Sequence, residues 1–103
     1  MFIIFDTETT GLPKDYNAPL SDGQNWPRLV QLAWQIHDEK GDLVEAWDYI
    51  VKPEGFTIPY SATKVHGITD EKAAEEGVEL SWLLQTFNAA LHKASFIVGH
   101  NIE

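Results

Sequence analysis

Residues 2–12, FIIFDTETTGL, decide the fold prediction because they join a short apolar run to two carboxylates and a glycine. The run Phe2–Phe5 has the length and composition of a buried strand. Side chains two residues apart in a strand share a face, so Asp6 and Glu8 lie together if the strand continues to Glu8. Neighbouring carboxylates repel each other unless a cation lies between them, and Mg²⁺ and Mn²⁺ prefer such oxygen ligands. The stretch predicts a strand that ends in a divalent-metal site.

Two other interpretations of Asp6 and Glu8 are open at this point. The carboxylates could be solvated residues at the end of a strand, since such pairs are common. The strand could also lead into a phosphate-binding loop, but that design needs glycine and hydroxyl residues soon after the aspartate. Glu8 occupies that position, which favours metal ligation over a phosphate-binding loop.

The next two segments predict strands that continue the sheet. Apolar and polar residues alternate over residues 29–37, with Val30, Leu32, Trp34 and Ile36 on one face. A similar alternation over residues 43–51 follows the turn signal EKGD at 39–42. The first three strands are therefore predicted to form an antiparallel meander.

The second half of the chain predicts helices and a fourth strand. Gly67 suits the left-handed end of a short helix, and Thr69 can cap the turn that follows. A longer apolar helical stripe is predicted from Leu80, Leu83, Leu84, Phe87, Ala90 and Leu91. Residues 95–100, SFIVGH, indicate a strand that a helical crossover would place parallel to the first. The predicted architecture is one α/β domain with a mixed sheet.

Composition bounds the class of protein. The chain has 103 residues, of which 44% are hydrophobic, enough for one domain with its own core. It has no cysteine, which excludes disulfides and thiolate metal sites. No membrane-spanning run and no signal-peptide pattern is present, so a cytoplasmic location without a membrane partner is predicted. The net charge of −9 repels nucleic acid overall, but bound divalent cations would reverse the local sign.

Four segments together resemble a known family. FDTETTGL at 5–12 is similar to the first motif of the DnaQ-like (DEDD) 3′→5′ exonucleases, typified by the proofreading ε subunit of bacterial DNA polymerase III. RLVQLAWQI at 28–36 resembles the family's second strand, and IPYSATKVHGIT at 58–69 resembles its histidine–glycine segment. FIVGHN at 96–101 resembles the start of its second motif. The matches keep the family's order and run over essentially the whole chain.

The resemblance implies an RNase H-like fold, two divalent cations (Mg²⁺ or Mn²⁺) and hydrolysis of the terminal phosphodiester at a 3′ end. Asp6 would bridge both metal ions, and Glu8 would ligate the ion that activates the attacking water. The residues implied to bind the terminal nucleotide are Thr9 through its backbone, Leu12 against the base, His66 and Gly67 in the pocket, and Asn101 beside the scissile phosphate. For His66, a helix-capping or surface histidine is the alternative.

The resemblance also implies that residues 1–103 are the N-terminal part of a single exonuclease domain, interrupted within the second motif. Of the family's four carboxylates the chain supplies Asp6 and Glu8, and the others, with the histidine or tyrosine base, would follow Glu103. We therefore expect the chain alone to hydrolyse nothing. We also expect self-association through an exposed strand edge.

The function predicted from these observations is that of a 3′→5′ exonuclease acting in proofreading or repair. A single-stranded 3′ end is the expected substrate, with DNA favoured over RNA, and a DNA polymerase subunit is the expected protein partner. The alternative is an inactive homologue that holds a 3′ end or a polymerase partner without cutting. An unrelated α/β domain that carries the Asp6–Glu8 pair by coincidence is the third interpretation.

Overall fold

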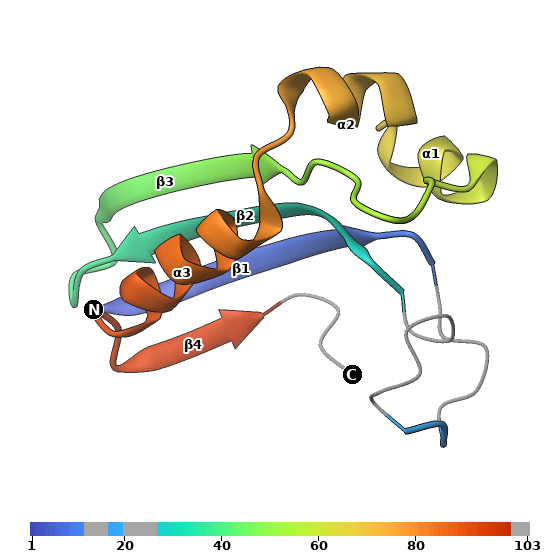
Figure 1. The fold of residues 1–103 in the computed structure, drawn as a ribbon. Helices are drawn as coiled ribbons and strands as arrows, with labels where there is room; N and C mark the ends of the chain where they lie inside the picture. The colour runs from blue at the N-terminus through green and yellow to red at the C-terminus, as the bar shows by residue number, and fades with distance from the viewer. Residues whose placement is uncertain (12–16, 20–26, 100–103) are drawn as a thin grey trace.

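A computed structural model describes residues 1–11, 17–19 and 27–99 of the chain. Every predicted element is present there, and each strand and helix follows in the predicted order (Figure 1). The elements are β1 (Phe2–Thr9), β2 (Leu29–His37), β3 (Leu43–Ile50), α1 (Tyr60–His66), α2 (Asp70–Glu76), α3 (Leu80–Leu91) and β4 (Phe96–Gly99). Residues 12–16, 20–26 and 100–103 lie outside this description.

The strands form one mixed sheet in the order β3-β2-β1-β4. β1 pairs antiparallel with β2, β2 pairs antiparallel with β3, and β4 runs parallel to β1. This arrangement confirms the predicted meander and the crossover to a parallel fourth strand. β1 is therefore a central strand, with a neighbour on each side.

The turn between β2 and β3 is closed by Asp38. Its carboxylate oxygen Oδ1 accepts hydrogen bonds from the backbone N–H groups of Lys40 at 2.9 Å and Asp42 at 3.0 Å. Gly41 in the same turn has a φ of +86°, a conformation that residues with a side chain rarely adopt. The aspartate and the glycine close the turn, and a bulge between Ile36 and His37 then shifts the register in which β2 and β3 pair.

Helix α3 covers one face of the sheet (Figure 1). The side chains of Ile3 in β1 and Leu83 in α3 are completely buried, and the ring of Phe5 meets the ring of Phe87 edge-on at 5.4 Å. The buried residues of this layer are Ile3, Leu32, Trp34, Ile36, Val51, Leu83 and Ala90. Leu32, Trp34 and Ile36 of β2 face this layer and Val30 is also buried, which confirms the alternation predicted for that strand.

Leu84 departs from the predicted helical stripe. Its side chain is 49% exposed, whereas that of the adjacent Leu83 is fully buried. Leu80, Phe87 and Leu91 pack at the edge of the core as expected. The prediction for Leu84 was wrong because helical spacing gives the angle of a side chain around the axis, but not how much of the circumference the sheet covers.

Helices α1 and α2 pack around a second apolar cluster, which consists of Val30, Ile58, Ala62, Ile68 and Ala73. α1 ends at Gly67, whose φ of +76° confirms the predicted left-handed cap. α2 begins at Thr69, whose hydroxyl accepts a hydrogen bond from the N–H of Lys72 at 3.1 Å, as expected of a cap. The cluster holds both helices near the end of the sheet where β1 finishes (Figure 1).

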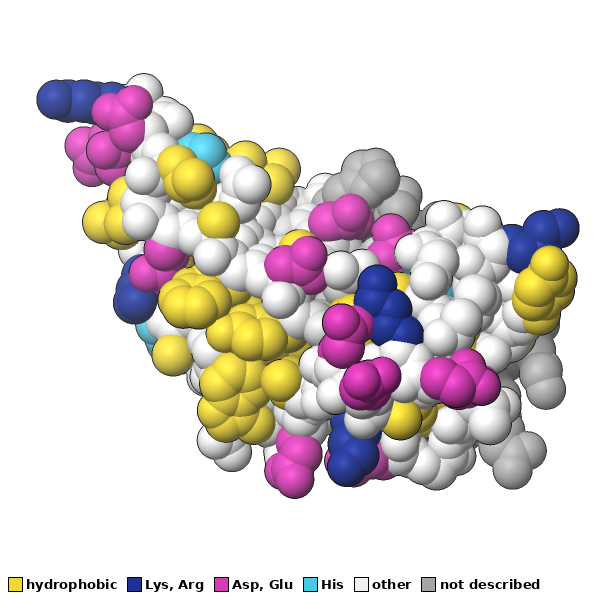
Figure 2. All heavy atoms as spheres, turned by 90° about the horizontal axis from the view of Figure 1, so that it is seen from above, with side chains coloured by type: hydrophobic (Ala, Val, Ile, Leu, Met, Phe, Trp, Pro, Cys, Tyr) yellow, Lys and Arg dark blue, Asp and Glu magenta, His cyan; other side chains and the backbone are white. Residues whose placement is uncertain are grey.

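The sheet face opposite α3 is not covered by any helix in the described part of the chain (Figure 1). Phe96 and Val98 in β4 are 72% and 50% exposed, and Ile4 beside them in β1 is 38% exposed. Hydrophobic side chains also gather in one patch on the outer surface (Figure 2).

No helix in the described ranges is long and apolar enough to cross a membrane.

Replacing Leu83 by alanine should destabilise the fold by about 2–5 kcal/mol, because the change leaves a cavity in the layer between α3 and the sheet. Leu84→Ala is a matched control on the same helix, and it should change stability by only about 0.5 kcal/mol because its side chain is half exposed. Urea unfolding of both variants measures the difference. Equal losses of stability would contradict the packing described for α3.

Candidate functional site

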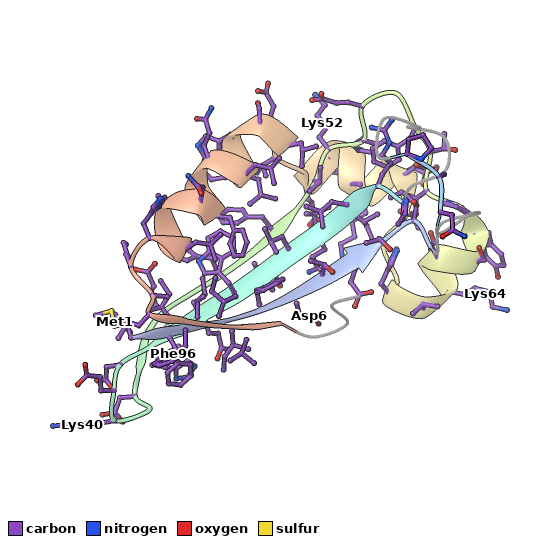
Figure 3. All side chains as sticks on the ribbon, turned by 90° about the horizontal axis from the view of Figure 1, so that it is seen from below. Met1, Asp6, Lys40, Lys52, Lys64 and Phe96 are labelled. Carbon is purple, nitrogen blue, oxygen red and sulfur yellow. The ribbon has the colours of Figure 1, made fainter. Side chains whose placement is uncertain are left out.

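Asp6 and Glu8 lie on the face of the sheet that α3 does not cover. β1 continues past Asp6 to Thr9, so the two carboxylates are two residues apart in one strand and share a face. Phe5 packs on the opposite side against α3, which fixes this orientation of the strand. Figure 3 shows Asp6 on the side of the sheet away from α3. The structure thus brings the two predicted carboxylates together.

A shallow groove of about 420 Å³ begins at Asp6 and runs across β2 to β3. Its walls include Ile4 and Gln35 at one end and Asp6 and Asp48 at the other. In the strand pairing, Asp6 lies opposite Ala33 and Ala33 lies opposite Asp48. The small alanine side chain between the two aspartates keeps the face open at this point.

Gln31 and Asp48 are polar residues of this face that the sequence analysis did not single out. Gln31 lies opposite Glu8 in the pairing of β1 with β2, and its amide Nε2 donates a hydrogen bond to Asp48 Oδ1 at 2.6 Å. Counting back from the turn at Asp38–Asp42 would have missed Asp48, because a bulge between Ile36 and His37 shifts the pairing of β2 with β3 by one residue. The face around Asp6 and Glu8 is therefore more acidic than the first motif alone indicated.

The chain turns sharply just after the two carboxylates. The ladder between β1 and β2 has a bulge between Glu8 and Thr9. The Thr9 hydroxyl donates to the carbonyl of Gly11 at 3.1 Å, and the N–H of Gly11 approaches that hydroxyl at 3.3 Å. Gly11 has a φ of +140°, a conformation that residues with a side chain rarely adopt. The backbone at Thr9 is thus held close to the end of the carboxylate-bearing strand.

His66 is held in a defined orientation at the end of α1. Its ring nitrogen Nδ1 accepts a hydrogen bond from the N–H of Ile68 at 3.1 Å, and the Thr63 hydroxyl donates to the carbonyl of Ile68 at 2.7 Å. The other ring nitrogen, Nε2, is buried and has no hydrogen-bond partner among the described residues. The ring thus bonds through Nδ1 to the backbone at the end of α1, which agrees with the helix-capping alternative, while Nε2 is withdrawn from bulk water.

The predicted site residues are only partly brought together. Asp6, Glu8 and Thr9 are contiguous on β1, and the segment at His66 and Gly67 lies beyond the end of that strand (Figure 1). Among the described residues, the His66 ring bonds within its own segment and not to Glu8. Leu12 and Asn101 lie outside the described residues.

The comparisons with known proteins identify the family. The family model described as "Exonuclease" (RNase_T) matches residues 3–103. The chain belongs to this exonuclease family. It is also 34% identical over 105 residues to the PolC-type DNA polymerase III of Streptococcus thermophilus strains LMD-9 and CNRZ 1066, a match that covers 95% of the chain and 6% of each polymerase. The chain thus corresponds to a small part of these relatives.

The solved structures that resemble this exonuclease chain include exonuclease I. One is E. coli exonuclease I in complex with a dA13 oligonucleotide, with a TM-score of 0.76 and 20% identity. Another is exonuclease I from Methylocaldum szegediense, with a TM-score of 0.76 and 21% identity. Each match covers 97% of this chain and 20% of the other. At these identities the likeness establishes the fold, which is the RNase H-like mixed sheet that the sequence predicted.

The hydrogen bonds predict opposite tautomers for two histidines of the chain. A nitrogen that accepts a hydrogen bond carries no proton, so neutral His66 should be protonated at Nε2. His92 is the internal control, because its Nδ1 faces the carbonyl of Asn88 at 3.2 Å and should carry the proton. Long-range ¹H–¹⁵N NMR spectra in mildly alkaline solution, where imidazoles are neutral, distinguish the two. Finding His66 protonated at Nδ1 would contradict the orientation described here.

Proposed function

We propose that the chain is part of a 3′→5′ exonuclease that removes nucleotides from single-stranded DNA ends. The observation that carries the proposal is the pair of carboxylates, Asp6 and Glu8, on the open face of a central strand in a chain of the exonuclease family. Two adjacent carboxylates are unfavourable together unless cations compensate them. A site that hydrolyses phosphodiesters needs such cations, since the substrate is itself an anion.

Mg²⁺ or Mn²⁺ fits this donor set because its members are carboxylate oxygens. Asp6 and Glu8 would be the residues of this chain that hold the ions. The described residues contain no group of three or more histidine, cysteine, aspartate or glutamate side chains that could hold a metal. The two carboxylates would thus supply only part of the ligand shell. When bound, the ions would activate water and stabilise negative charge on the phosphate.

The remaining proposed roles concern the terminal nucleotide. The backbone at Thr9 is held in place by the bonds to Gly11, so it would offer a fixed surface to the nucleotide. His66 and Gly67 would line the nucleotide pocket, and Gly67 leaves space there because no atom lies within 4 Å of the position that a Cβ would take. Leu12 would pack against the terminal base, and Asn101 would lie beside the scissile phosphate. Apolar and stacking contacts accept any base, as removal of successive nucleotides requires.

We further propose that residues 1–103 are the N-terminal part of a single exonuclease domain. The chain matches the family model over residues 3–103 but spans about a fifth of the exonuclease I chains and 6% of the PolC-type polymerases. The similarity to a PolC-type polymerase supports a proofreading role beside a polymerase.

The natural polypeptide that carries these residues should release 3′-terminal nucleotides from labelled single-stranded DNA in Mg²⁺ or Mn²⁺, and not in chelator. Asp6→Asn should lower the rate at least about a hundredfold, because the variant weakens a metal ligand. Asp48→Asn is the matched control, since Asp48 lies on the same face but opposite Ala33 and not in the first motif. Its rate should stay near that of the unchanged protein.

Two outcomes would contradict the proposed function. Oligonucleotide binding without release would make the protein a binding module of the same fold. Equal rates for Asp6→Asn and the unchanged protein would remove Asp6 from the catalytic site.

The isolated chain should bind Mg²⁺ or Mn²⁺ weakly and hydrolyse nothing, because two carboxylates cannot complete a two-metal site. Thermal unfolding with increasing Mn²⁺ measures the binding, since a ligand of the folded state raises the melting temperature. The increase should be small and should disappear in Asp6→Asn. Metal-dependent turnover by the purified chain, abolished by the same substitution, would show that the described residues are sufficient for catalysis.

A further inference from the structure

The charge of the chain limits where it can hold a nucleic-acid strand. The net charge is −9, and acidic side chains are spread over much of the surface in view in Figure 2. Lys72 and Lys93 are engaged with Glu76 at 4.0 Å and Glu45 at 3.6 Å. The phosphates of a nucleic-acid strand would therefore have to contact basic residues that form no ion pair with an acidic residue.

Among the described residues Arg28 forms no ion pair with an acidic side chain, and it is attached to the turn that follows Glu8. The N–H of Thr10 donates to the carbonyl of Arg28 at 3.0 Å, and the N–H of Arg28 donates to the Thr10 hydroxyl at 2.9 Å. The guanidinium of Arg28 lies 5.7 Å from the centre of the Phe56 ring. Phe56 in turn packs against the second apolar cluster, which holds the ring beside Arg28 in place.

Lys64 is paired with an aromatic ring in the same way. Its ammonium lies 5.9 Å from the centre of the Tyr60 ring, one turn earlier on α1. Tyr60 is 76% exposed, so one face of a largely solvent-accessible ring remains available. α1 is anchored to the second apolar cluster through Ala62, which is the cluster that also supports Phe56. The two cation–aromatic pairs therefore flank one cluster.

The position of these pairs relates them to the carboxylates. Figure 3 shows Lys64 at the end of the molecule toward which β1 runs, with Asp6 between it and Lys40 at the opposite end. Arg28 adjoins the last residues of β1 through Thr10. A strand whose 3′ end reached Asp6 and Glu8 could thus continue over Arg28 and then over α1.

We propose that Arg28, Phe56, Tyr60 and Lys64 form a basic–aromatic track for the single strand that leads to the carboxylates. Arg28 and Lys64 would contact phosphates, while the Arg28 plane and the Tyr60 ring would stack on bases. Stacking and phosphate contacts are independent of base identity, which suits a strand that moves stepwise through one site. This inference rests on the proposed exonuclease function, because that function defines where the 3′ end lies.

Fluorescence anisotropy with labelled oligothymidylate, in chelator so that nothing is cut, tests the track in the natural polypeptide. Tyr60→Ala should weaken binding about tenfold, because it removes a stacking ring that supports little of the fold. The double variant Arg28→Gln and Lys64→Gln should weaken binding. The slope of the logarithm of the binding constant against the logarithm of the salt concentration should become shallower by about 1.4, at ~0.7 for each lost phosphate contact in single strands. Lys40→Gln is the control at the opposite end of the molecule, where it removes one positive charge, as each substitution of the double variant does, and it should bind as the unchanged protein does.

The outcomes separate the track from the nuclease. The track would be overturned if Tyr60→Ala and the double variant bound the oligonucleotide as tightly as the unchanged protein. It would also be overturned if the double variant bound as tightly as Lys40→Gln. Failure of the unchanged protein to bind the oligonucleotide at low salt would also overturn it. If hydrolysis were absent but the expected binding differences were found, the track would stand and the proposed nuclease function would fall.

Discussion

The packing of Ile3 and Phe5 beneath α3 is the constraint on which the rest of the site depends. Because side chains alternate along a strand, burying these two residues on one face places Asp6 and Glu8 on the other. A shift of one residue in the pairing of β1 would bury the carboxylates and expose the core residues. The fully buried Ile3 and Leu83 and the Phe5–Phe87 contact make that shift costly. The apolar layer thus orients the carboxylates without touching them.

The carboxylates also show why an acidic chain is compatible with an anionic substrate. Asp6 and Glu8 share one face, and together they repel phosphate unless cations compensate them. The basic side chains of Arg28 and Lys64 instead lie over aromatic rings beyond the end of β1. Charge is therefore segregated along the proposed path, with acidic residues where metal ions would bind and basic residues where the strand would continue.

The segments that end the regular elements contribute as much to the site as the elements themselves. Gly67 ends α1 in a left-handed turn, and that turn brings the N–H of Ile68 onto Nδ1 of His66. At the end of β1, the bulge after Glu8 and the bend at Gly11 hold the backbone of Thr9 in place. Each of these turns depends on a glycine φ that other residues rarely adopt. A rigid sheet thus carries two sharply turned segments at one end.

The sequence by itself determined the features that depend on local geometry. The alternation of β2, the turn at Gly41, the end of α1 at Gly67, the cap at Thr69 and the shared face of Asp6 and Glu8 all follow from residues a few positions apart. Only the tertiary structure decided which residues meet across the fold: Asp48 joins the face of Asp6, Arg28 lies over Phe56, and Leu84 turns away from the sheet. These outcomes depend on strand pairing and on how far the sheet extends beneath the helix. The physical reason is that strand and helix periodicity act over a few residues, whereas packing joins segments that the sequence separates by tens of residues.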